Sequence, residues 1–293
     1  MEITSEAIEV SSFDGARLAA TLLRRAGALA RAPRGTPLVL LPGHMKPAAT
    51  LEATARAIIS QADGPDLALL VDYRGRGRSE PRADAGAYTP RAEAQDVVSL
   101  LDALNWHHAD FLGSARGGLV AMCLTAPRPA LIRRLVLGDI GPEIDGVGLA
   151  RLRLTAARSK DPASWEEAAE RLRKESGGRY PALADADYEA LARAVYADDD
   201  GKPRPRVHPS VVEHFASIDA DERYPTLWPE FRALRSHPVL LLRAERSDVL
   251  SDRTAERMAR EHPALTVETV EGQGHPPLLH LGDWPERIAR FLR

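Results

Sequence analysis

The sequence predicts an α/β fold, with a mostly parallel central sheet, helices on both faces and an inserted helical lid. Short apolar runs typical of buried strands alternate with segments whose apolar residues recur at helical spacing. This alternation stops at about residue 143 and resumes near residue 236. The 293 residues suffice for one large domain carrying an insertion. We therefore expect residues 1–142 and 236–293 to form the core and residues 143–235 the lid.

The first part of the chain contains the clearest strand and helix signals. An alternating segment around Asp14-Gly15, residues 7–23, is typical of a β-hairpin. Apolar runs predict strands at 37–43, 67–75, 109–113 and 132–141, and helical spacing predicts helices at 50–62, at 89–104 and from 116 onward. Thr50 is a possible N-cap of the first helix. Thr89 followed by Pro90 is a strong start for the second.

The second part of the chain differs in character before the alternation returns. Residues 164–175 and 185–200 are helical in pattern but polar, and a turn-rich stretch, "DDDGKPRPRVHPS", follows. These features predict a helical lid, and a solvated accessory helix pair is the alternative interpretation. Beyond this region we expect strands at 237–248 and 265–275, with a helix at 252–262 between them and a closing helix from Trp284.

Composition excludes several classes of function. The net charge of −3 and the lack of a broad basic bias argue against a nucleic-acid partner. No apolar run reaches the roughly 18 residues that a membrane helix needs, and no secretory signal is visible, so we expect a cytoplasmic protein. The single cysteine, Cys123, excludes an internal disulfide and the usual zinc clusters. The "GRGRS" stretch lacks the spacing of a dinucleotide site. We therefore expect no cofactor and no metal.

Three positions stand at the carboxyl ends of predicted strands, where parallel sheets place their sites. Ala115 lies in the strand-to-helix turn "GSARGG", Asp248 follows "VLLLRAERS", and His275 follows "VETVEGQG". The turn resembles the nucleophile elbow G-x-S-R-G-G, and "DYRGRGRS" at 72–79 and "LPGH" at 41–44 are similar to two further motifs of the same family. On these residues the chain resembles the α/β-hydrolase fold superfamily over nearly its whole length.

The resemblance implies hydrolysis of an ester, a lactone or a related small acyl substrate by a Ser-His-Asp mechanism. His275 would act as base and Asp248 would orient it, with Asp139 of "LGDIGP" as the alternative acid and His280 as the rival histidine. The backbone N–H groups of Arg116 and His44 would form the oxyanion hole, with Met45 as the alternative to His44. The implied partner is a small-molecule acyl substrate, without nucleic acid or membrane.

Arginine recurs in the "DYRGRGRS" segment, at positions 74, 76 and 78. The three side chains could bind an anionic substrate. Pairing with surface carboxylates, which would stabilise the turn, is the favoured interpretation.

Alanine stands where the resemblance places the nucleophile, and a methyl group cannot attack a carbonyl. One hypothesis is a serine hydrolase whose nucleophile has been lost. A second is a relative that binds a ligand as a sensor, or that uses the His275–Asp248 pair alone in cofactor-free chemistry. A third makes the adjacent Ser114 the nucleophile, although the elbow should turn its side chain away from the site.

Overall fold

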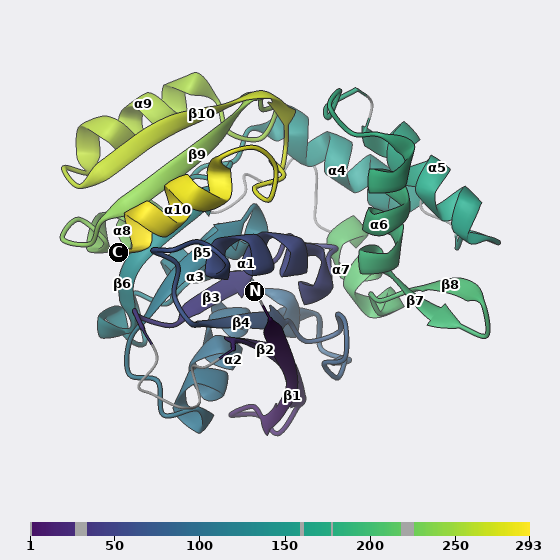
Figure 1. The fold of residues 1–293 in the computed structure, drawn as a ribbon, viewed down its shortest axis with the longest axis horizontal. Coiled ribbons are helices and arrows are strands. Elements are labelled where there is room, and N and C mark those ends of the chain that lie inside the picture. Colours follow the sequence, from purple (N-terminus) through teal and green to yellow (C-terminus); the bar gives the residue numbers. More distant parts are fainter. Residues whose placement is uncertain (1, 27–33, 159–160, 177, 218–225) are drawn as a thin grey trace.

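An eight-stranded sheet forms the centre of the computed structural model (Figure 1). The structure describes residues 2–26, 34–158, 161–176, 178–217 and 226–293. The strand order is β1-β2-β4-β3-β5-β6-β9-β10. The β1–β2 and β2–β4 pairs are antiparallel, and all the other pairs are parallel. The prediction of a mostly parallel sheet is confirmed.

The strands lie where the apolar runs predict them. They are β1 (Ile3–Ser11), β2 (Arg17–Arg25), β3 (Leu38–Leu41), β4 (Leu67–Asp72), β5 (Ala109–Ser114), β6 (Ile132–Gly138), β9 (Val239–Arg246) and β10 (Leu265–Gly274). The first two form the predicted hairpin, and β3, β4 and β5 are buried along their whole length. A strand covered on both faces needs apolar residues at every position, and this explains the continuous runs.

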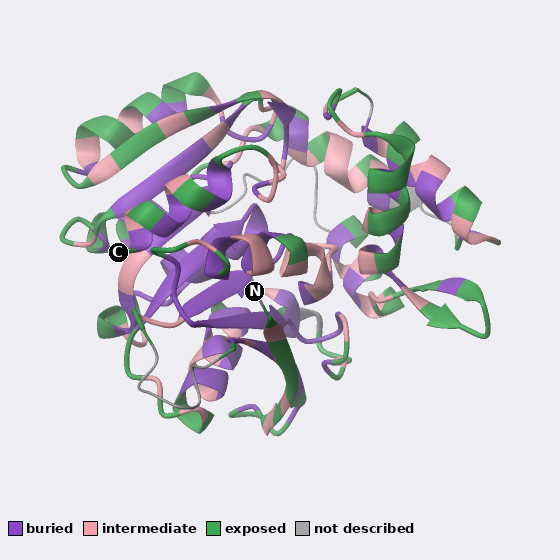
Figure 2. Cartoon of the chain, in the orientation of Figure 1, coloured by how far each residue is buried: buried purple, intermediate pink, exposed green. Residues whose placement is uncertain are grey.

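Alternation along each strand sends side chains to two cores, one on each face of the sheet. Val39 and Leu41 enter one core, and Leu38 and Leu40 enter the other. The first core is covered by α2 (Pro90–Ala103), α3 (Arg116–Cys123), α8 (Trp228–Ala233) and α9 (Asp252–Glu261), and the second by α1 (Glu52–Ile59) and α10 (Trp284–Leu292). Figure 2 shows these central strands as buried. Among the described residues, no helix is both long and apolar enough to cross a membrane.

Of the two N-caps predicted from the sequence, one is confirmed and one is wrong. The Thr89 hydroxyl accepts a hydrogen bond from the Ala92 N–H at 3.2 Å, as an N-cap should. Thr50 is not a cap, because it lies inside a short 3-10 helix (Ala48–Leu51) and its hydroxyl donates to the Pro47 carbonyl. The other 3-10 helices are Ala85–Tyr88 and Pro129–Leu131.

The segment between β6 and β9 contributes no described strand to the central sheet. It contains α4 (Gly146–Arg158), α5 (Trp165–Ser176), α6 (Asp185–Val195) and α7 (Pro209–Ser217) (Figure 1). A separate hairpin of β7 (Tyr196–Asp199) and β8 (Lys202–Pro205) occupies part of the predicted turn-rich stretch. Its Asp200-Gly201 turn has φ values of 49° and 81°, the left-handed backbone that hairpin turns favour. The last helix of the predicted 143–235 range, α8, packs on the sheet instead.

Candidate active site

The chain turns sharply from β5 into α3 at Ala115. This residue has φ 48° and ψ −118°, a conformation that costs a residue with a side chain about 1–3 kcal/mol. Its N–H donates to the Gly138 carbonyl at 2.9 Å, and its own carbonyl accepts from the Gly118 N–H at 2.9 Å. Neighbouring backbone therefore holds the strained turn with alanine in place.

Two glycines permit the close approach of backbone that this turn requires. A Cβ on Gly117 would lie 1.9 Å from the Leu41 carbonyl oxygen, and a Cβ on Gly113 would lie 2.4 Å from the Gly118 nitrogen. Both distances are far below van der Waals contact, so neither position tolerates a side chain. The glycines of the "GSARGG" motif are thus explained by packing.

His275, at the end of β10, is held by a buried carboxylate. Its Nδ1 lies 2.9 Å from Asp139 Oδ2, and the exposed fractions of the two side chains are 3% and 0%. The same carboxylate accepts from the Ala244 N–H at 3.0 Å and from the Ser247 hydroxyl at 2.7 Å. With Nδ1 engaged by Asp139, Nε2 is the ring nitrogen left for proton transfer.

The expectation that Asp248 orients His275 is wrong. Asp248 pairs instead with the Arg151 guanidinium of α4, with one Nη2–Oδ1 distance of 2.9 Å. Asp139 follows β6 directly, whereas Asp248 lies two residues beyond β9 and against the inserted segment. Burial is the largest single effect on Asp248 and raises its pKa, but the hydrogen bonds and charge of Arg151, together with smaller contributions, leave this pKa below its ordinary value.

Four of the residues singled out in the sequence line one cavity of about 130 Å³, namely His44, Ala115, Arg116 and His275. Met45, the alternative to His44, lines it as well. The rival nucleophile Ser114 and the rival histidine His280 are not among the lining residues. Most of the remaining wall is apolar. Sheet-side residues Leu119, Ile140 and Val249 supply one part, and Leu149, Leu152 and Phe215 of α4 and α7 supply another.

The backbone of Arg116 stands at the start of α3. A first-turn N–H has no acceptor within its own helix, and the partial positive charge of the helix N-terminus favours a developing anion there. The side chain of Arg116 is directed elsewhere, because its Nε donates to Glu93 Oε2 at 2.7 Å. Its contribution to the cavity is therefore the main chain rather than the guanidinium.

Glu93 of α2 also fixes the loop that carries His44. Arg76 Nη1 donates to Glu93 Oε1 at 2.8 Å, and Arg76 Nε donates to the His44 carbonyl at 2.8 Å. Burial and the charges of Arg116 and Arg76 hold the pKa of His44 well below its ordinary value, so this ring is neutral. One buried carboxylate thus braces both loops whose backbones line the cavity.

The favoured interpretation predicted that the arginines of "DYRGRGRS" pair with surface carboxylates. They do pair with carboxylates, but these partners are buried. Arg74 contacts Asp96, and Arg76 contacts Glu93; the exposed fraction of each of these four side chains is 2% or less. The sequence carried a signal for both acids, because Glu93 and Asp96 share the helical spacing of Val97 and Leu100 on the buried face of α2. Our sequence reasoning did not use it.

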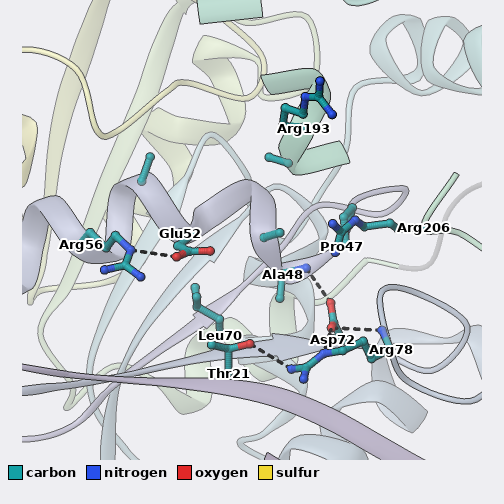
Figure 3. A pocket seen from close by; sticks show the side chains of 13 residues that line it. Thr21, Pro47, Ala48, Glu52, Arg56, Leu70, Asp72, Arg78, Arg193 and Arg206 are labelled. Carbon is teal, nitrogen blue, oxygen red and sulfur yellow. Dashed lines mark hydrogen bonds and ion pairs between the residues drawn. The ribbon is translucent and has the colours of Figure 1, made fainter. Parts of the chain in front are cut away.

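A second, larger hollow of about 510 Å³ is lined by residues of α1, of β4 and of the segment that follows β3 (Figure 3). Pro47, Asp72 and four arginines, at positions 56, 78, 193 and 206, are among the residues that line it. Arg56 contacts Glu52 at 2.8 Å, and Arg78 donates to the Thr21 hydroxyl at 3.0 Å. Neither Ala115 nor His275 reaches this hollow, so size does not identify the active site.

Comparisons with known proteins agree with this geometry. The model of the alpha/beta hydrolase family matches residues 38–291. A 3-hydroxybutyrate-oligomer hydrolase of Cupriavidus necator is 31% identical over 72% of this chain and 76% of its own length. A 2-(acetamidomethylene)succinate hydrolase of Mesorhizobium japonicum is 28% identical over 71% of each chain.

A solved structure extends the similarity over the whole chain. The crystal structure of an alpha/beta hydrolase from Novosphingobium aromaticivorans has a TM-score of 0.85 and 30% identity, and covers 98% of both chains. Matches of this extent, on a sheet of the order described above, show that this chain belongs to the alpha/beta hydrolase family.

Proposed function

We propose that this scaffold hydrolyses a small ester or a related acyl compound, with position 115 as the nucleophile position. In the chain as it stands, Ala115 leaves a binding site for the acyl substrate without the group that attacks it. The observation that carries the proposal is the His275–Asp139 hydrogen bond, which holds the imidazole at the cavity that also contains the Ala115 turn.

With serine at position 115, each neighbouring residue has a defined task. His275 Nε2 takes the hydroxyl proton as the oxygen attacks the carbonyl carbon, and later gives it to the leaving group. Asp139 holds the ring and stabilises the imidazolium form. The N–H groups of Arg116 and His44 receive the negative charge on the carbonyl oxygen. Water then cleaves the acyl-enzyme with His275 as base.

The inserted segment and the relatives support the same reaction class. Leu149, Leu152 and Phe215 supply cavity wall from outside the sheet. On this basis we assign the described part of residues 143–235, without α8, as a lid. The two curated relatives are named as hydrolases of 3-hydroxybutyrate oligomers and of 2-(acetamidomethylene)succinate. Both names fit hydrolysis of a small acyl compound.

Restoring the hydroxyl tests the proposal. Ala115→Ser should raise the hydrolysis of 4-nitrophenyl acetate and butyrate by roughly 10³-fold or more. A fluorophosphonate probe should label the same variant, and peptide mass spectrometry should place the label on residue 115. The double variant Ala115→Ser with His275→Ala is the control and should lose both the esterase rate and the labelling.

A folded Ala115→Ser protein that is inert to esters and to the probe would contradict the proposal. Ligand binding without turnover, as in a sensor, would then be the better assignment. Labelling of residue 114 in the unsubstituted protein would instead make Ser114 the nucleophile.

A further inference from the structure

Lys46 is a cationic residue in the lining of the candidate active site. Its N–H donates to the Gly43 carbonyl at 3.2 Å, in the loop that follows β3. A Cβ built on Gly43 would lie 3.7 Å from Lys46 Cγ and 3.9 Å from Ala115 Cβ. The lysine stem and the nucleophile position therefore flank the same glycine, and both residues line the 130 Å³ cavity.

The ammonium group has no carboxylate partner within ion-pair distance among the described residues. Two charged groups act on it from farther away, Glu175 in the last turn of α5 and Arg179, which lies beyond the end of that helix. The carboxylate of Glu175 favours the charged form and the guanidinium of Arg179 opposes it. Burial is the largest effect, and it lowers the pKa of Lys46. A partly buried cation in this position has a carboxylate acting on it only from a distance, whereas such groups are normally paired directly.

The other cation in the cavity lining is already engaged. The Arg116 guanidinium pairs with Glu93, with a distance of 2.7 Å between Nε and Oε2. The nearby apolar wall, formed by residues such as Leu119, Leu149 and Phe215, offers no charge. In such surroundings a charge-assisted hydrogen bond is stronger than in water, so an anionic group of a ligand would gain most by meeting Lys46.

We propose that Lys46 binds a carboxylate on the acyl portion of the substrate, so that the preferred substrates are short acyl esters with a terminal negative charge. The inference rests on the proposed function, because it identifies the substrate class of that same site. The cavity volume of about 130 Å³ is small for a ligand pocket, which favours a short acyl chain. Lys46 is a residue that determines specificity and takes no part in proton transfer.

A matched pair of esters measures this preference directly. In the Ala115→Ser background, kcat/KM is measured for mono-(4-nitrophenyl) glutarate and for 4-nitrophenyl pentanoate, whose acyl groups have equal carbon number. The ratio should favour glutarate, and Lys46→Met should lower it about tenfold or more. Lys46→Arg should recover part of the ratio. Because the readout is a ratio, general damage to the site cancels.

Two control variants separate the proposed contact from indirect effects of a lost charge. Lys174→Met removes a lysine whose side chain is 75% exposed and should leave the ratio unchanged. Glu175→Gln should also retain the preference for glutarate. If Glu175→Gln removes this preference as fully as Lys46→Met does, Lys46 acts by holding α5 in position and not by binding the substrate, and the proposal is wrong. A preference for 4-acetoxybenzoate over its methyl ester, with none for glutarate, would place the carboxylate on the leaving group and overturn the acyl assignment.

The remaining outcomes distinguish this inference from the proposed function. If Ala115→Ser hydrolyses pentanoate but Lys46→Met leaves the ratio unchanged, the proposed function stands and this inference falls. If Ala115→Ser is inert to all esters, the proposed function fails, and calorimetric binding of glutarate to the Ala115 protein decides about Lys46. A Kd at least tenfold weaker in Lys46→Met supports the contact, and an unchanged Kd overturns it.

Discussion

Replacing Glu93 with glutamine removes one negative charge from the buried cluster of Glu93, Arg76 and Arg116 beside the candidate active site, while the side-chain volume is kept. Glu93 accepts from Arg76 at 2.8 Å and from Arg116 at 2.7 Å, and its exposed fraction is 0%. Glutamine offers only one oxygen, and its NH₂ group would face a guanidinium that also can only donate. The variant therefore loses a charge-assisted hydrogen bond and leaves two buried cations with one carboxylate fewer.

Removing one member of a buried ion pair costs about 3–5 kcal/mol, because the remaining charge stays desolvated. We expect Glu93→Gln to reduce the free energy of unfolding by this amount. Glu52→Gln is the matched control, since it makes the same change in a pair with Arg56 whose side chains are 38% and 40% exposed. An exposed pair contributes at most about 1 kcal/mol.

Urea unfolding at neutral pH, followed by circular dichroism, measures both variants against the parent protein. The informative quantity is the difference between the two losses of stability. The two variants could lose free energy of unfolding by amounts that differ by less than about 1 kcal/mol. In that case the Glu93 cluster does not stabilise the fold as argued, and it does not hold the His44 loop and Arg116 in place.

Two further predictions follow from the site and the core. In the Ala115→Ser background, Asp139→Asn should lower kcat on 4-nitrophenyl butyrate about 10³-fold or more, because His275 loses its orienting carboxylate. Asp248→Asn should change kcat by less than about tenfold. If Asp248→Asn lowers kcat more than Asp139→Asn does, Asp248 is the acid that orients His275. Burial raises the pKa of Cys123 to about 12, so at pH 8 its thiolate fraction should be roughly three orders of magnitude below that of an unfolded chain. A disulfide-exchange reagent should therefore titrate this thiol only in denaturant, and rapid reaction of the folded protein would contradict the burial.

Elements that are buried on both faces could be predicted from the sequence, because their composition follows from their surroundings. The strands β3, β4 and β5 are continuous apolar runs for this reason. The start of α2 was predictable because Thr89 and Pro90 act locally. The β7–β8 hairpin was missed although Asp200-Gly201 is a strong turn signal, since its short strands are polar and mostly exposed.

The choice between Asp139 and Asp248 depended on information that the sequence does not contain. Both residues stand at the ends of predicted strands, and the resemblance favoured Asp248 with Asp139 as the alternative. The decision lies in long-range contacts, since the Ala244 N–H and the Ser247 hydroxyl hold Asp139 against His275 while Arg151 engages Asp248. The position of Lys46 beside Ala115 is likewise a product of the fold, and no local signal points to it.

The cavity wall is formed by two parts of the chain, the ends of the central strands and the helices of the inserted segment. Residues at the strand ends, such as Ala115 and His275, are fixed by the sheet beneath them, whereas Leu149, Leu152 and Phe215 belong to helices outside the sheet. The helices α4 and α7 therefore set part of the shape of the cavity, while the strand ends hold the proposed reactive residues. Exchanging α4 and α7 for those of another family member would redraw the shape of the acyl pocket while the histidine, its carboxylate and the strained turn stayed in register.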